Sequence, residues 1–291
     1  MPLAALVAAT LFIGVPLAAQ QKVPLVLNHL VLTLDSATYR DIANSDFVRD
    51  KFSAAESGFL NGPDGGDGLR LFGKYNFVQL VVPAAKTAGA QTGDVGMVLA
   101  VERVGALDRL KGQGRFDAGG RIVSVPADGP VHANLYVESS KRLRPAGPDS
   151  TSAHTLFEIM EYSRDAVQHV ALTDSQSLVN LSGVRFFRHN FDPTKLLSQL
   201  TGATLAIPVD DIAKIVAVLK RDNVNIVADG DGAIVKLDGF TLHLIPPYRG
   251  AGVKQLQFAL TRAAVANPTY RFGPKSQLRF GPGLIAVWDF K

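Results

Sequence analysis

The stretch from Leu25 to Asp35 reads Leu-Val-Leu-Asn-His-Leu-Val-Leu-Thr-Leu-Asp, an aliphatic run with polar residues set into it. A run of this length and composition predicts a β-strand. Side chains of a strand alternate between two faces, so this strand has a large aliphatic face and a face of smaller and polar residues. The first face holds Leu30, Leu32 and Leu34, and the second holds His29, Val31 and Thr33.

The residues after this strand predict a helix and three further strands. Ser36 is a good N-cap residue, and apolar residues at helical spacing extend the predicted helix to Phe52. The strands that follow are expected near Glu56–Leu60 and at Leu69–Phe72 and Tyr75–Val82. The predicted order is strand, helix, strand, strand, strand.

The same order recurs about 70 residues later in the chain. A strand is predicted at Val95–Glu102, a short helix at Gly105–Lys111, and strands at Arg121–Val125, Val131–Glu138 and Thr155–Tyr162. An internal repeat weighs more in a fold prediction than a single motif. We therefore predict an α+β protein of repeated βαβββ modules, whose curved mixed sheets surround a cavity.

Three regions follow from this pattern: a paired βαβββ domain at 25–162, a connecting segment at 163–203, and a third α+β unit of related type at 204–291. The third unit is predicted to begin with a strand at Thr204–Val209. Its helix, Asp210–Arg221, has acidic residues at its start and basic residues at its end, as the helix dipole favours. Six strands are predicted after it: Asn225–Ala228, Ala233–Leu237, Phe240–Ile245, Leu256–Leu260, Ser276–Phe280 and Leu284–Phe290.

Composition excludes several classes of protein. The chain has 291 residues, of which 47% are hydrophobic and 19% charged, so a disordered chain is excluded. With no cysteine there can be no disulfide framework, thiolate metal site or cysteine nucleophile. The net charge of +4 is spread along the chain without a basic stripe, so no nucleic-acid partner is expected.

The first residues predict export from the cell. The segment Leu3–Ala19 carries no charge and ends in small residues, which is typical of a cleaved signal peptide spanning residues 1–19. The alternative is an uncleaved N-terminal anchor, because hydropathy separates the two poorly at this length. We expect a periplasmic or secreted protein with no stable membrane span after cleavage.

The alternation within the predicted last strands brings polar residues onto the face shared with His29. Phe77 and Gln79 share a face in the first copy, as do Leu156, Glu158 and Met160 in the second. Aligning the two strands sets Gln79 opposite Glu158. His154 lies on the same face as Glu158, four residues away, where it could line the same cleft.

Repeated βαβββ units with Asn28-His29 in the first strand, and a carboxylate or amide within the last strand, resemble the vicinal oxygen chelate superfamily, which includes glyoxalases, extradiol dioxygenases and bleomycin-resistance proteins. Three segments further resemble a glyoxalase-like bacterial family of unknown function: Leu71–Asn76, Met160–Tyr162 and Ala286–Phe290. In that superfamily, His and Glu from the first and last strands hold a divalent metal that chelates two adjacent substrate oxygens.

The resemblance implies a metal site made of His29, Gln79 and Glu158, completed by water, for Fe, Mn, Zn or Ni. It aligns Gly96 with a fourth ligand position, where glycine offers no ligand. The alternative is that His29 is a hydrogen-bonded cavity residue and Glu158 pairs with an arginine.

Two functions remain open. In the first, the cavity binds a small molecule without metal, through Phe77, Leu156, Met160 and His154, because binding pockets are mostly apolar with few polar anchors. In the second, the protein is a divalent-metal-dependent lyase or dioxygenase. We rank the binding function slightly higher, and the sequence does not fix an oligomeric state.

Overall fold

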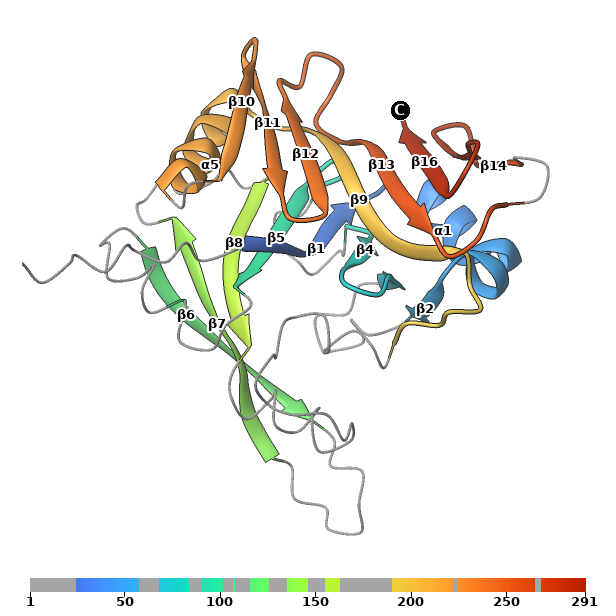
Figure 1. Ribbon diagram of the computed structural model, residues 1–291, viewed down its shortest axis with the longest axis horizontal. Helices are drawn as coiled ribbons and strands as arrows, with labels where there is room; N and C mark the ends of the chain where they lie inside the picture. Colours follow the sequence, from blue (N-terminus) through green and yellow to red (C-terminus); the bar gives the residue numbers. More distant parts are fainter. Residues whose placement is uncertain are drawn as a thin grey trace, which may run out of the picture.

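The computed structural model describes residues 25–57, 68–83, 91–101, 107, 116–125, 135–145, 155–162, 190–221, 224–264 and 268–291, with 116–125 and 135–145 described by their backbone alone. The predicted signal peptide at 1–19 and His154 lie outside the described residues. So do most of the predicted helix Gly105–Lys111 and of the connecting segment 163–203. The described chain is mostly sheet with few helices, and its strands form two open mixed sheets (Figure 1).

The first sheet has eight strands in the order β2-β3-β4-β1-β5-β8-β7-β6. Strand β1 pairs in parallel with β4, β5 pairs in parallel with β8, and the two parallel pairs join through an antiparallel β1–β5 contact. The strands are β1 Leu25–Thr33, β2 Ala54–Ser57, β3 Gly68–Phe72, β4 Phe77–Val81, β5 Val95–Val101, β6 Phe116–Val125, β7 Leu135–Pro145 and β8 Thr155–Tyr162.

The second sheet also has eight strands, in the order β10-β11-β12-β9-β13-β16-β15-β14. This is the order of the first sheet with each strand number raised by eight, and again the central contact, β9–β13, is antiparallel. The strands are β9 Leu197–Ala206, β10 Asn225–Asp229, β11 Gly232–Leu237, β12 Phe240–Ile245, β13 Gly252–Leu260, β14 Thr269–Phe272, β15 Ser276–Phe280 and β16 Ile285–Phe290.

The helix predicted from Ser36 to Phe52 is in fact two elements, α1 (Ser36–Ala43) and the π-helix η1 (Phe47–Phe52). The prediction of Ser36 as N-cap was wrong, because the cap is Asp35, whose Oδ1 accepts a hydrogen bond from the Thr38 backbone N–H at 3.0 Å. A carboxylate one residue earlier therefore satisfies the orphan donor of the first turn.

The start of the second sheet also differs from the prediction. Strand β9 begins at Leu197, seven residues before the predicted strand, and ends at Ala206. Pairing with β12 and β13 on its two sides holds its polar and glycine residues extended, which local propensity does not indicate. Strand β14 was not predicted, whereas the helix α5 (Val209–Arg221) matches its prediction within one residue.

One apolar core lies between the two sheets. The aliphatic faces of β1, β4, β5 and β8 and those of β9, β12, β13 and β16 belong to a single cluster of buried side chains. Helix α5 adds Ile212, Ile215, Val218 and Leu219, which recur every three or four residues along one side of the helix. We call the opposite face of each sheet its outer face.

Element η1 crosses from the first sheet to the second. Phe52 lies edge-on to Phe258, Phe280 and Trp288 of the second sheet, with ring centroids 5.5, 6.2 and 5.9 Å apart. Such edge-to-face contacts add to the stabilisation from burial itself. The N-terminal half of the chain therefore supplies part of the core that covers the C-terminal sheet.

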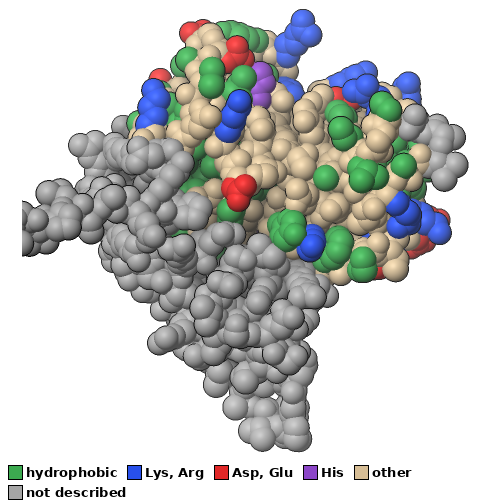
Figure 2. Space-filling model, viewed as in Figure 1, with side chains coloured by type: hydrophobic (Ala, Val, Ile, Leu, Met, Phe, Trp, Pro, Cys, Tyr) green, Lys and Arg blue, Asp and Glu red, His purple; other side chains and the backbone are tan. Residues whose placement is uncertain are grey.

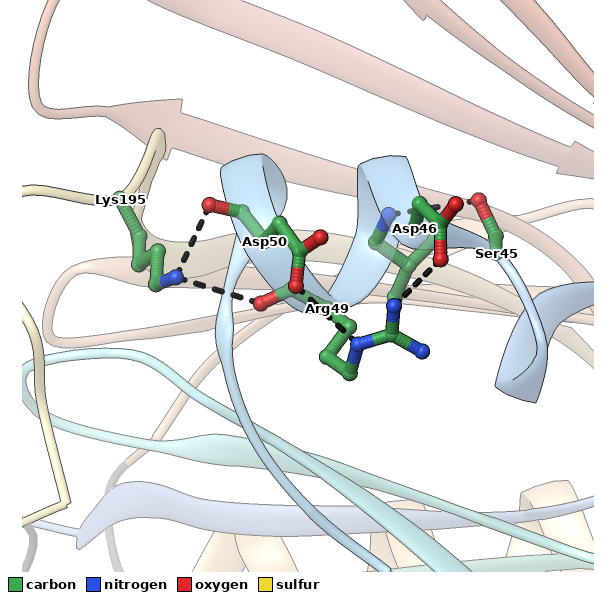
Figure 3. A network of polar contacts seen from close by, with 6 residues as sticks. Ser45, Asp46, Arg49, Asp50 and Lys195 are labelled. Carbon is green, nitrogen blue, oxygen red and sulfur yellow. Dashed lines mark hydrogen bonds and ion pairs between the residues drawn. The ribbon is translucent and has the colours of Figure 1, made fainter.

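Polar contacts also tie the two sheets together. Lys195 donates hydrogen bonds to the carbonyl oxygens of Asp50 at 2.9 Å and Arg49 at 3.3 Å, at the end of η1 (Figure 3). Arg49 in turn pairs with Asp46 and Asp50 on the same element. Lysine at the C-terminal end of a helix satisfies carbonyl groups that have no partner within the helix.

In the described part of the chain, we find no helix both long enough and apolar enough to cross a lipid bilayer.

Candidate functional site

The four central strands of the first sheet carry most of the predicted site residues on the outer face. Pairing across β4, β1, β5 and β8 aligns one row of residues, which we call the His29 row, and a second row two positions further along. Residues paired across neighbouring strands project to the same face. The His29 row is Phe77, His29, Val98 and Glu158, and the next row is Gln79, Val31, Gly96 and Leu156.

His29 is held by two neighbours. Its Nδ1 lies 2.6 Å from Asn28 Oδ1, and its ring stacks on Phe77 with centroids 4.4 Å apart and planes 12° apart. An amide oxygen accepts but does not donate, so Nδ1 of His29 donates this hydrogen bond. The side chain is 9% exposed, which places an oriented imidazole in a buried position.

Glu158 lies in the same row on β8 and is fully buried. The residues around it on the outer face are apolar, because Val98, Ala100 and Met160 form a small buried cluster of their own. A carboxylate in such surroundings is costly unless polar partners accompany it.

The pairing of the strands corrects the alignment that the sequence suggested. Gln79 lies beside Val31, and Phe77 stands beside His29, so Gln79 is one row away from His29 and Glu158. Gly96 likewise belongs to the Gln79 row, and Val98 fills the β5 position next to His29. His29, Gln79 and Glu158 therefore share the outer face but not one row.

The structure describes three of the four other predicted binding residues. Phe77 and Met160 are buried on the outer face, and Leu156 is partly exposed there. His154 lies outside the described residues, so its predicted role stays a prediction. The sequence predicted a concavity open to solvent, but His29, Glu158 and Met160 are buried.

Among the described residues, we find no group of three or more His, Cys, Asp or Glu side chains that could hold a metal ion. Within the His29 row, the side chains of a type that binds metal ions are the imidazole of His29 and the carboxylate of Glu158. The third predicted ligand, Gln79, comes from the next row. The described residues therefore fit a two-ligand arrangement rather than the complete set that a tightly held divalent ion takes.

The outer face of the second sheet carries a polar row that sequence reasoning missed. Pairing across β12, β9, β13 and β16 aligns His243, Thr204, Gln255 and Asp289. Gln255 Nε2 donates to Asp289 Oδ1 at 2.9 Å, and His243 Nε2 lies 2.6 Å from Asp229 Oδ2. Figure 2 shows mainly uncharged side chains and backbone across the centre of this view. Polar and apolar residues alternate along these strands, and this alternation was the sequence signal that could have predicted the polar row.

Comparisons with known proteins give a family but no activity. A search of curated proteins found no match. A hypothetical protein from Staphylococcus aureus of known structure is 10% identical, with a TM-score of 0.46 over 85% of this chain and 95% of that one. A xylose isomerase-like TIM barrel/4-hydroxyphenylpyruvate dioxygenase fusion protein is 17% identical, with a TM-score of 0.46 over 84% of this chain and 39% of that one. The family of unknown function DUF5829 matches residues 27–290, and the chain belongs to this family.

Proposed function

We propose that the protein binds a small molecule on the outer face of the first sheet, between His29 and Glu158. The observation that carries the proposal is that these two buried polar side chains share one row of the sheet with the apolar residues Phe77 and Val98. Binding sites for small molecules are mostly apolar and contain a few placed polar groups.

The spacing of the row suggests the size of the ligand. His29 and Glu158 are two strands apart, with Val98 between them, which corresponds to about 10 Å between their Cα atoms. Two side chains pointing the same way across such a span can hydrogen-bond to opposite ends of a molecule about the size of one aromatic ring. Phe77, stacked on His29, and Met160 supply apolar surface for its body.

Two further parts of the proposal rest on sequence together with topology. The shared strand order of the sheets, with α1 following β1 and α5 following β9, supports repeated βαβββ modules of the vicinal oxygen chelate type. The apolar segment Leu3–Ala19 supports export to the periplasm or beyond the cell.

A second candidate function, divalent-metal chemistry, is favoured by one specific observation. Asn28 accepts the Nδ1 proton of His29, and such an outer hydrogen bond commonly orients a metal-binding imidazole. The set of metal ligands in the His29 row is incomplete, because the third predicted ligand, Gln79, lies in the next row. We therefore place small-molecule binding first and treat metal binding as an outcome to be measured.

The test uses catechol and 4-hydroxybenzoate as probes, with affinity measured by calorimetry on the folded protein. His29→Ala and Glu158→Gln should each weaken binding at least tenfold, because the first removes the imidazole and the second removes the charge of the carboxylate. His243→Ala and Asp238→Asn are matched controls, since they remove an imidazole and a carboxylate charge on the second sheet, outside the His29 row. Val98→Leu adds one methylene between the anchors and should also weaken binding.

The outcomes separate the two functions. Binding that needs no added metal and is lost in both anchor variants supports the proposal. Stabilisation by Mn²⁺, Fe²⁺, Zn²⁺ or Ni²⁺ that disappears in His29→Ala favours the metal-dependent function, because a ligand of the native state raises stability with concentration. Failure of both probes to bind the parent protein, or equal binding to the anchor and control variants, contradicts the proposed site.

A further inference from the structure

A small cavity lies where the two sheets meet, at the end of β1. Its volume is about 80 Å³, and its walls come from the end of β1, the start of α1, the loop before β5, the start of β13 and the residue after β16. We call it the lysine cavity. The polar side chains that line it include Thr38, Thr92, Asp35, Lys254, Lys275 and Lys291.

The cavity is built on a close approach of two backbones. Gly93 and Gly252 have φ angles of 96° and 112°, which favour glycine over other residues. A Cβ on Gly252 would lie 2.9 Å from the Gly93 Cα, and a Cβ on Gly93 would lie 3.0 Å from the Ala251 carbonyl oxygen. The two sheets can meet this closely only because neither position carries a side chain, so the wall of the cavity is defined by backbone.

Positive charge exceeds negative charge in the side chains around this cavity. The one side-chain carboxylate in its lining, Asp35, already accepts hydrogen bonds from Thr38 at 3.0 and 2.9 Å and pairs with Lys275 at 3.4 Å. Lys254 Nζ donates to the Arg249 carbonyl oxygen at 3.3 Å, and no described carboxylate forms an ion pair with it. Lys291 likewise has no carboxylate partner among the described residues.

The placement of Lys254 is unusual for a surface lysine. It is the extra residue of a β-bulge, because the pairing of β13 with β9 shifts between Val253 and Gln255. Bulges redirect a side chain away from the regular alternation of the strand and occur often beside binding sites. Lys254 is half-buried, and burial lowers the pKa of its ammonium group. A cation that is partly removed from water without a counter-charge favours the arrival of an anion.

We propose that the lysine cavity binds a small oxyanion, a phosphate or carboxylate group, through Lys254 and Lys291, with Lys275 completing the charge. A volume of about 80 Å³ holds a group of a few heavy atoms and excludes a nucleotide or sugar phosphate from full entry. Phosphate and carboxylate groups are the anions that lysine ammonium groups bind in proteins. The three lysines come from β13, the residue before β15 and the residue after β16, so the bound anion would bridge strands of the second sheet where they meet β1 and α1.

The experiment measures thermal stability and calorimetric affinity of the full chain with inorganic phosphate and with acetate, each against chloride at equal ionic strength. Lys254→Met keeps the apolar stem and removes the charge, and Lys254→Arg keeps the charge. Lys236→Met, an exposed lysine of β11, is the matched control. Lys291→Gln tests a second cation of the cavity without disturbing the bulge, in case Lys254→Met folds poorly.

We expect phosphate or acetate to bind the parent and the Lys236→Met control equally, and to bind Lys254→Met and Lys291→Gln at least tenfold more weakly, with partial recovery in Lys254→Arg. Preference for phosphate identifies a phosphate-bearing ligand, and preference for acetate a carboxylate. Equal stabilisation of all variants is a general salt effect and overturns the proposal. The absence of any effect beyond that of chloride also overturns it.

Discussion

Asn76 is the best single position at which to test how strongly the two sheets depend on each other. It lies in the β3–β4 connection of the first sheet, and its side chain bonds the backbone of Leu200 in β9 of the second. Asn76 Nδ2 donates to the Leu200 carbonyl oxygen at 2.9 Å, and Asn76 Oδ1 accepts the Leu200 N–H at 2.9 Å. Both residues are buried.

Replacing Asn76 by alanine removes both bonds at once. The Leu200 N–H and carbonyl oxygen are then both buried without a partner, at about 1–3 kcal/mol each, so the free energy of unfolding should fall by about 2–6 kcal/mol. Asn76→Asp keeps the acceptor but sets a carboxylate against the Leu200 carbonyl oxygen, and should be at least as destabilising.

The assay is urea denaturation at 25 °C and pH 7, followed by tryptophan fluorescence and by circular dichroism. Trp288 is the single tryptophan and is buried in the shared core, so fluorescence reports on the second sheet. Asn44→Ala is the control, because Asn44 is exposed at the end of α1. A loss below about 0.5 kcal/mol for Asn76→Ala, the range of ordinary surface substitutions, would refute the reasoning.

Two further predictions concern a helix cap and the core. The pKa of Asp35 is lowered, chiefly by the hydrogen bond from the Thr38 backbone N–H, so its stabilisation is present above the unfolded pKa of about 3.9 and is lost as pH falls through the lower folded pKa. Asp35→Ala should therefore cost about 1 kcal/mol in free energy of unfolding at pH 7. This difference from the parent should narrow as the pH falls below about 3.9, and a difference that stays constant in urea denaturation across that range contradicts the prediction. Trp288 Nε1 donates to Ser276 Oγ at 2.6 Å in the core, so Ser276→Ala should cost about 1–3 kcal/mol by the same assay, while Ser36→Ala on the surface should change little.

The sequence by itself determined which residues face the core. Alternation with a period of two residues assigned Leu30 and Leu32 to one face and His29 to the other, and both leucines are fully buried in the shared core. The helix at Val209–Arg221 could likewise be predicted from the sequence, because its apolar residues recur every three or four positions. These features depend on the order of residue types along a short segment, and that order is present in the sequence itself.

The tertiary structure decided which residues are neighbours across strands. Alternation with a period of two residues identifies which face of a strand a side chain is on, but it does not identify the residue that it pairs with. The pairing register depends on turns, bulges and the partner strand. The bulge between Leu27 and His29 in the β1–β5 pairing sets His29 beside Val98, while parallel pairing with β4 sets it beside Phe77. The site therefore contains His29 and Glu158 in one row with Gln79 in the next, an arrangement that no single strand encodes.

The tertiary structure likewise decided where the polar strand β9 runs and where the lysine cavity forms. Gly202 has weak strand propensity alone, yet pairing partners on both sides hold it extended. Lys254 and Asp35 are more than two hundred residues apart in the chain, and the contact of Gly93 with Gly252 brings their segments together. Local sequence fixes local pattern, whereas the meeting of distant segments depends on the free energy of packing the whole chain.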